Sequence, residues 1–305
     1  MTRFVAIFIP MLWLGTAVLA QPVSPACQTL TSRIAQSPKL LEGRLLDEAL
    51  FEAADVDCPE LARTILDQGA SVQARNRFGS TPLITAAGRG AREIAAMLLE
   101  RGAEIGHANL GGTTPLMSAV EGGRRRMVAD LLAAGAAVNV ANREGVTPVM
   151  SAAFQGDARM LETLLEAGGD LSAEDRHGKG ALVYAAGRAY PAIVTRLLAA
   201  GADADRVWGH DLTALMWVAG HGNDAPEADS LAVAQLLIAA GAAVDRQDDR
   251  GKTALMIAAE RGHRQMVDFL LQAGADATLR DKTGNAARDL AASDEIRKAL
   301  DLAGQ

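Results

Sequence analysis

Aromatic residues are scarce in this chain. Phenylalanine, tryptophan and tyrosine together make up 4% of its 305 residues, although hydrophobic residues of all kinds make up 49%. So few rings do not suit one large conventional core. Alanine and leucine are abundant instead, and glycine occurs 30 times. This composition favours many short helices that pack closely and are separated by frequent turns.

Lysine is also rare, because 25 of the 30 basic residues are arginine. Together with the alanine and glycine content, this preference suggests a GC-rich bacterial genome. The formal net charge is −7, which argues against a nucleic-acid backbone as a partner.

The sequence has one prominent apolar run, at its start. Phe4 to Leu19 is apolar, follows the single charge of Arg3, and ends in the small-residue exit Val18-Leu19-Ala20. The run is interrupted by Pro10 and is shorter than the roughly 20 residues of a spanning helix. It therefore predicts a secretory signal peptide over residues 1–20, with a retained anchor as the alternative. No cysteine follows directly, so a lipid anchor is not expected, and the protein is expected to be periplasmic or secreted.

Two motifs repeat along the rest of the chain with one shared spacing. A Gly-Ala or Gly-Gly pair begins at Gly69, Gly102, Gly135, Gly168, Gly201, Gly241 and Gly274. A Thr-Pro-Leu-like motif begins at Thr81, Thr114, Thr147, Gly180, Thr213 and Thr253. Both motifs recur at the interval that separates Gly69 from Gly102. Each motif has one longer interval, from Gly201 to Gly241 in the first and from Thr213 to Thr253 in the second.

The residues of one unit predict a helix pair. Thr81 suits the N-cap of a first helix and Pro82 its first turn, because that position needs no backbone donor. Ile94, Met97 and Leu98 have the spacing of a second helix, and Gly102 can end it in the left-handed conformation. An extended turn then leads to the next unit.

These motifs resemble the ankyrin repeat. The Asp or Asn that opens its turn is matched by Asn76, Asn109, Asn142, Asp175, Asp248 and Asp281, and Trp208 is the exception. The resemblance implies a mostly α solenoid of stacked helix pairs joined by extended hairpin-like turns. We divide the chain into the signal peptide (1–20), an N-terminal extension with a short helix (21–43) and a repeat domain (44–305). The repeat domain comprises an N-terminal cap (44–76), six repeats (77–109, 110–142, 143–175, 176–208, 209–248 and 249–281) and a C-terminal cap (282–305).

Two departures from the family pattern affect the first helices. The family's histidine is replaced by apolar residues: Ile84, Met117, Met150, Val183, Met216 and Met256. Methionine fills similar space, so the fold is expected to survive, with a loss of rigidity from the missing hydrogen bond. Gly180 replaces the threonine of repeat four, which predicts its weakest helix start.

No catalytic or metal-binding constellation is recognisable, and we expect neither an enzyme nor a cofactor. The sequence lacks GxSxG, HExxH and P-loop patterns. His177 and His210 fall at equivalent turn tips of adjacent repeats. Neighbouring helices lie about 8–10 Å apart, whereas ligands of one zinc ion need nitrogens within about 4 Å.

The resemblance implies that a protein partner binds the concave side, which first helices and turns line. Scarce aromatics gather in the same third of the chain as three histidines. The predicted binding residues are His177, Tyr184, Trp208, His210, Trp217 and His221. Aromatic residues are favoured anchors of binding. The alternatives are that Tyr184 and Trp217 fill space between helices and that Trp208 packs in a corner.

Two further segments have competing interpretations. Arg124 to Arg126 could contact an acidic partner or lipid, but a solvated convex face is favoured. An insertion around Asn223 to Leu231 lengthens repeat five; a tolerated surface insertion is favoured over a functional loop.

Cys27 and Cys58 are the two cysteines of the chain. Export would place them where disulfides persist, and an even count fits one bridge. A bridge would tie an amphipathic helix within residues 27–42 to the capping unit. The alternative is two free thiols, because sequence does not show that the side chains meet.

The function expected from the sequence is a non-catalytic scaffold that binds a protein client outside the cytoplasm. An immunity or inhibitor protein that blocks a toxin or enzyme is one alternative. A metal-binding protein or enzyme and a membrane-surface protein are others. Contact with a membrane is not expected, and no motif identifies the client.

The predicted signal peptide leads to a simple test. When the chain is expressed in a bacterium with its apolar start included, the exported protein should begin at Gln21, because the small residues before it match a cleavage site. N-terminal sequencing checks this. An exported protein that still begins with Met1 would show that the segment is retained.

Overall fold

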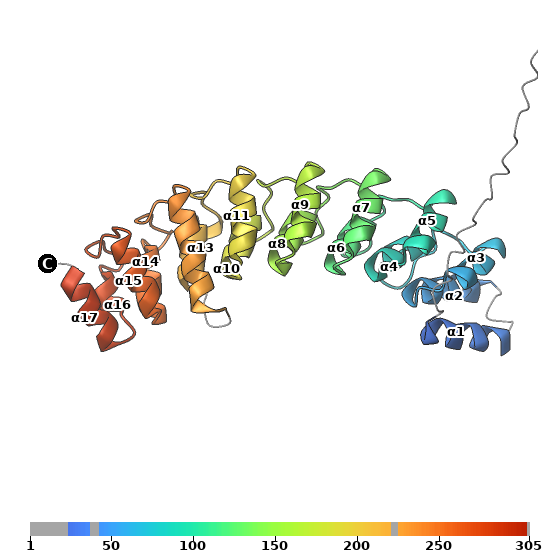
Figure 1. Cartoon of the computed structure of the whole chain (residues 1–305), viewed down its shortest axis with the longest axis horizontal. Coiled ribbons are helices and arrows are strands. Elements are labelled where there is room, and N and C mark those ends of the chain that lie inside the picture. The colour runs from blue at the N-terminus through green and yellow to red at the C-terminus, as the bar shows by residue number, and fades with distance from the viewer. Residues whose placement is uncertain (1–23, 37–42, 221–224, 304–305) are drawn as a thin grey trace, which may run out of the picture.

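The computed structural model describes residues 24–36, 43–220 and 225–303. The predicted signal peptide, His221, and Asn223 and Asp224 of the insertion lie outside these ranges. Within them, helix pairs stand side by side in one bowed row (Figure 1). None of the described helices is both long and apolar enough to cross a membrane.

The described helices follow one another in pairs along the chain. The N-terminal end consists of α1 (Pro25–Gln36), α2 (Arg44–Asp55) and α3 (Pro59–Asp67). The first three repeats contain α4 (Pro82–Arg89), α5 (Arg92–Glu100), α6 (Pro115–Glu121), α7 (Arg125–Ala133), α8 (Pro148–Gln155) and α9 (Ala158–Glu166). The next three contain α10 (Ala181–Gly187), α11 (Pro191–Ala199), the short 3-10 turn η2 (Gly209–Asp211), α12 (Ala214–Gly220), α13 (Glu227–Ala239), α14 (Ala254–Arg261) and α15 (Arg264–Gln272). The C-terminal end consists of α16 (Ala287–Leu290) and α17 (Asp294–Ala303).

In every repeat except the fourth, where Gly180 stands, a threonine caps the first helix. Its hydroxyl accepts a hydrogen bond from the amide three residues later, as from Ile84 to Thr81 at 3.4 Å and from Met117 to Thr114 at 3.2 Å. Thr147, Thr213 and Thr253 make the same bond. The methionines that replace the family's histidine are buried behind these caps. Each first helix therefore keeps a capping bond wherever threonine is present.

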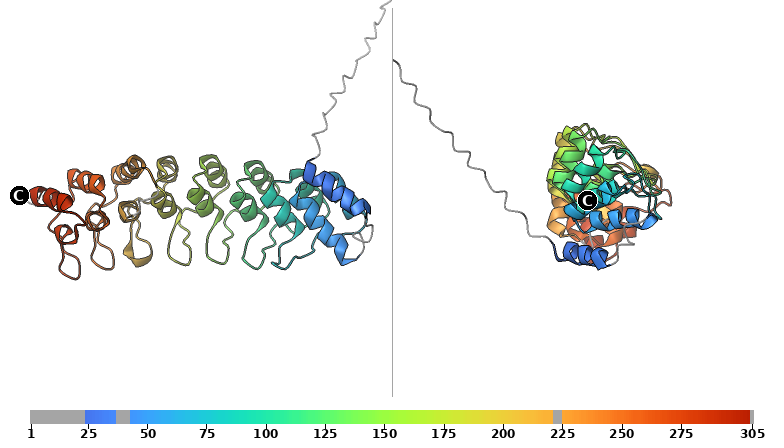
Figure 2. Two further views of the ribbon diagram at one scale, coloured as in Figure 1. Left: turned by 90° about the horizontal axis from the view of Figure 1, so that it is seen from below. Right: turned by 90° about the vertical axis from the view of Figure 1, so that its right-hand side faces the viewer.

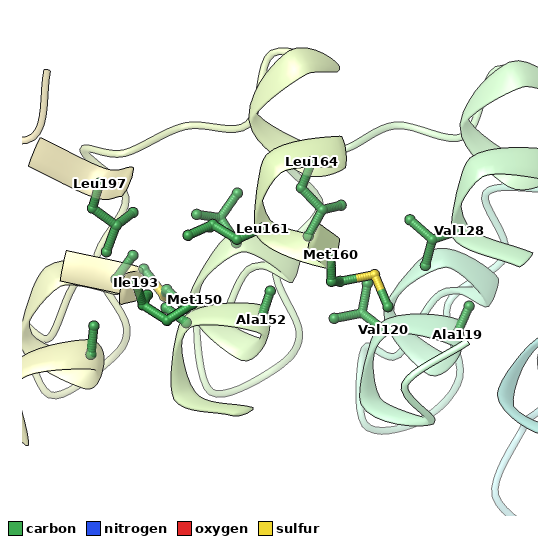
Figure 3. Close-up of a cluster of buried hydrophobic side chains, with 14 of the residues drawn as sticks. Ala119, Val120, Val128, Met150, Ala152, Met160, Leu161, Leu164, Ile193 and Leu197 are labelled. Atoms are coloured by element: carbon green, nitrogen blue, oxygen red, sulfur yellow. The ribbon is translucent and has the colours of Figure 1, made fainter. Parts of the chain in front are cut away.

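The core is one layer that continues through the row. The first helices contribute small pairs such as Ala152 and Ala153, and the second helices contribute larger residues such as Leu161 and Leu164. Figure 3 shows Ala152, Leu161 and Leu164 together with buried side chains of the neighbouring repeats, and these residues belong to one hydrophobic cluster. Alanine at the contact lets the first helices of adjacent repeats approach closely, which accounts for the scarcity of rings.

The turns form a second continuous system. They all extend to one side of the helices in the left view of Figure 2. In each turn except that of Trp208, an Asn or Asp side chain holds the local backbone; Asp175, for example, accepts from the amides of His177 and Lys179 at 2.8 Å. Backbone hydrogen bonds then join each turn to the next, as from the Leu110 amide to the Phe78 carbonyl at 3.0 Å. Successive repeats are thereby held in register at their tips.

Trp208 breaks the turn pattern, and the structure shows why. Its side chain is buried, with 6% exposed, so of the two interpretations of Trp208 the structure has the packed corner and not the exposed anchor. The indole instead covers Gly180, where a Cβ atom would lie 2.0 Å from the ring. Gly180 has an ordinary φ of −105°, so glycine is required there by space and not by backbone conformation. The two departures from the repeat pattern therefore compensate each other.

A short helix covers the N-terminal end of the row. Helix α1 lies at the N-terminal end of the row beside α2 (Figure 1), and its Cys27, Leu30 and Ile34 are buried in the hydrophobic cluster. A disulfide joins Cys27 of α1 to Cys58, directly before α3, with 5.2 Å between their Cα atoms. The end face of a solenoid is apolar and needs such a cover.

The contact between Trp208 and Gly180 predicts that Gly180→Thr changes the stability in opposite directions in the presence and in the absence of Trp208. In the wild-type background, Gly180→Thr should destabilise the protein by about 1–3 kcal/mol because the new side chain overpacks the ring. In a Trp208→Asp background the ring is absent, and the same change should stabilise by a few tenths of a kcal/mol through the restored cap. Urea unfolding of the four proteins measures both effects.

The matched control for this comparison is Thr147→Gly, which should cost only a few tenths of a kcal/mol because glycine is itself an acceptable N-cap. If Gly180→Thr has the same sign in both backgrounds, Trp208 and Gly180 are not coupled in this way.

The disulfide should stabilise the N-terminal end measurably. Its cysteines have a sequence separation of 31, and closing a loop of that length destabilises the unfolded chain by about 3–4 kcal/mol in the entropic account. We expect reduction to lower the urea midpoint of the exported protein. Mass spectrometry after alkylation without reduction should find one linked peptide that contains both cysteines. Two alkylated cysteines would exclude the bridge.

Candidate partner-binding site

Two of the predicted binding residues line one hollow. Tyr184 lies on α10 and Trp217 on α12, the first helices of repeats four and five, and both face a hollow of about 660 Å³. Phe154 from α8 and Tyr190 from the turn before α11 complete its aromatic wall. The hollow lies at the ends of the first helices, where each turns toward its second helix, and its lining extends from repeat three to Arg261 of repeat six.

Two rings of the hollow are in contact with each other, and a third lies over a glycine. The centroids of Phe154 and Tyr184 are 5.8 Å apart, and their planes meet edge to face at 85°. Tyr190 lies over Gly156, where a Cβ atom would come within 2.9 Å of the ring. Edge-to-face pairs are a favoured arrangement of aromatic rings.

Asp175 anchors the Tyr184 side chain. The Tyr184 hydroxyl donates to Asp175 Oδ2 at 2.5 Å. Burial and this bond to a carboxylate raise the pKa of Tyr184 well above its usual value. Burial opposes the charge of Asp175, but the bonds from Tyr184, Lys179 and His177 prevail, and the pKa of Asp175 is lowered. Tyr184 therefore keeps its proton and Asp175 its charge at neutral pH.

Small residues make room for the hollow. Gly187 and Gly220 occupy the place of Glu121 in repeat two and Glu260 in repeat six. A side chain at Gly220 would be 2.9 Å from Ile257, and one at Gly187 would just reach Trp217 at 4.0 Å. Because glycine has no side chain, α10 and α12 do not fill the hollow between the rings at these two positions.

Three cations line the same hollow. Lys179 Nζ lies 4.6 Å from the centroid of the Trp217 ring, and Arg188 Cζ lies 4.7 Å from that of Phe154. Arg261, at the end of α14, is the third. Cations over aromatic faces are attracted by the negative ring surface, so charge and aromatic surface are combined in one site.

The predicted histidines lie elsewhere. His177 and His210 are exposed at neighbouring turn tips, and His210 Nδ1 lies 2.9 Å from Asp249 Oδ2. His221 lies outside the described residues. Within the described part of the chain, no three His, Cys, Asp or Glu side chains are placed to hold a metal ion.

The arginine run on α7 takes part in contacts between repeats. Arg124 Nε donates to the Gly88 carbonyl at 3.0 Å, and Arg125 is paired with Asp157 of the next repeat at 2.8 Å. Similar pairs join other neighbours, as from Arg196 to Glu162 at 2.7 Å. Such exposed pairs contribute little each, but they favour an ordinary surface here over a binding patch.

Five aromatic or cationic residues of the hollow were not among the predicted site residues: Phe154, Lys179, Arg188, Tyr190 and Arg261. Phe154 and Tyr190 could have been singled out from the sequence, because aromatic residues are rare in this chain. Nothing in the sequence distinguishes the three cations from its other basic residues. Their role depends on which residues face them from the adjacent repeat.

Comparison with known proteins agrees with this architecture. A family model described as ankyrin repeats, in three copies, matches residues 50–142, 124–207 and 182–281. Ankyrin repeat domain-containing protein 63 of Homo sapiens and that of Mus musculus are each 47% identical over 51 residues. That segment is 17% of this chain and 13% of each relative. Since the family model extends through all six helix pairs, this chain belongs to the ankyrin-repeat family.

Proposed function

We propose that this protein is a non-catalytic scaffold that binds a protein client on the concave side of repeats three to six. Ankyrin repeats are generally modules of protein–protein interaction, which supports the class of function. The location of the binding site is supported by the hollow between Tyr184 and Trp217, because four aromatic side chains line it in a chain that has few aromatic residues. Rings in a recess are favoured anchors of an interface.

The scaffold is proposed to act in the periplasm or outside the cell. The apolar start of the sequence supports export, and the Cys27–Cys58 bridge suits an oxidising compartment. A helix held by a disulfide at the end of the row would also keep the apolar end face of the stack covered there.

The proposal predicts the effect of removing two rings. Tyr184→Ala with Trp217→Ala should weaken client binding more than about tenfold, because buried rings at an interface commonly contribute over about 1 kcal/mol each. The client is first captured by crosslinking in periplasmic extract and identified by mass spectrometry. Its affinity for the purified wild-type and variant proteins is then measured by calorimetry.

The control variant is Arg126→Ala with Arg159→Ala, which changes exposed residues of the second helices α7 and α9. It should bind the client as the wild type does. Circular dichroism must show equal helix content in all three proteins. Loss of binding in the control variant, with normal binding in the ring variant, would place the interface on the convex side.

A further inference from the structure

The hollow has a charge opposite to that of the chain. Lys179, Arg188 and Arg261 line it, and Asp229 is the one carboxylate among its described lining residues. Asp175 lies beneath Tyr184, but it is buried and receives three hydrogen bonds. The chain as a whole has a formal net charge of −7. A locally positive recess on an acidic protein is therefore a distinct feature.

The repeat register explains why two of these cations have no ion-pair partner in the described part of the chain. Arg89, at the end of α4, pairs with Asp55 at 2.7 Å, and Asp55 lies at the end of α2, the first helix of the preceding unit. Arg188 occupies the same place in repeat four, but the position that faces it is Phe154. Arg261 occupies it in repeat six, and the position that faces it is Gly220. Among the described residues, no carboxylate forms an ion pair with either arginine.

A cation over a ring can still bind a carboxylate. A guanidinium has five N–H donors in its plane, and an ammonium has three. The contacts of Lys179 and Arg188 with the rings of Trp217 and Phe154 use the faces of those rings. Donors of both cations remain for an incoming group, while the rings offer apolar surface beside it.

A second recess of the molecule shows the opposite arrangement. The groove of about 560 Å³ between α1, α2 and α4 is lined by Arg33, Glu52 and Asp55. Arg33 is paired with Glu52, and Asp55 is paired with Arg89. Its charges are thus paired within the chain, whereas no carboxylate in the described ranges forms an ion pair with Lys179, Arg188 or Arg261.

We infer that this hollow binds an acidic segment of the client, in which an aromatic or aliphatic side chain enters between Tyr184 and Trp217 while neighbouring Asp or Glu carboxylates pair with Lys179, Arg188 and Arg261. The inference rests on the proposed function and names the chemistry of the partner. The volume of about 660 Å³ accommodates a side chain with part of its backbone, since pockets of about 300–1,000 Å³ hold molecules of that size.

The test is a selection from a random peptide library against the mature full-length protein. We expect enriched peptides with two or more acidic residues beside an aromatic or aliphatic one. Their affinity, followed by Trp fluorescence or calorimetry, should fall about tenfold or more in Lys179→Gln/Arg188→Gln/Arg261→Gln, because charge pairs of a binding site are lost. It should also fall as NaCl is raised, because salt screens exposed charges.

The matched control is Arg126→Gln/Arg159→Gln/Lys298→Gln, which removes three exposed charges away from the hollow. Because its net charge equals that of the test variant, it separates a local site from general attraction, and its affinity should match the wild type. Neutral or basic enriched peptides, no enrichment, or equal binding by the test variant would each overturn the inference.

The captured client separates this inference from the proposed function. If the client is lost from the Tyr184→Ala/Trp217→Ala variant but bound normally by the three-cation variant, the concave interface stands and the acidic partner is wrong. If both variants bind the client normally, both proposals fail. If both lose it while the control binds, both are supported.

Discussion

A helix pair of this protein has no interior of its own, and this constraint governs the rest of the structure. Residues such as Val149 and Ala152 of α8 are completely buried only because α6 and α10 lie on either side. Each repeat therefore depends on its neighbours. The disulfide-linked helix α1 and the amphipathic helix α17 close the two ends of the described stack.

The same constraint divides the positions of a repeat into two kinds. A stacking position does not change alone, as Trp208 and Gly180 show: the larger residue requires the smaller one at the start of the preceding first helix. The outward positions of the first helices are free to vary, because they are not needed for stacking. Phe154, Tyr184 and Trp217 use this freedom, and so does Gly187. A recess can thus be formed in one part of a regular array without loss of the fold.

Much of the fold follows from the sequence, because the regular spacing of the motifs and the threonine caps act within one unit. The site follows less well, because it depends on contacts between units. Tyr184 and Trp217 were recognisable as rare rings at one repeat position. Lys179, Arg188 and Arg261 were not, since an arginine is unusual here only when the facing residue is Phe154 or Gly220 instead of an aspartate. For Trp208, the informative signal was Gly180, far from it in the sequence but directly beneath its ring.

The hydrogen bond from Tyr184 to Asp175 links the turn of repeat four to the recess that its first helix borders. The turn fixes Asp175 through the amides of His177 and Lys179, and Asp175 in turn fixes Tyr184. Because the pKa of Asp175 is lowered and that of Tyr184 is raised, neither group changes charge near neutral pH, and the hydrogen bond between them is kept there. The proposed binding surface, held in this way, would lose less conformational freedom when a partner arrives. The stacked turns, which hold the repeats in register, therefore also preorganise the surface that those repeats present.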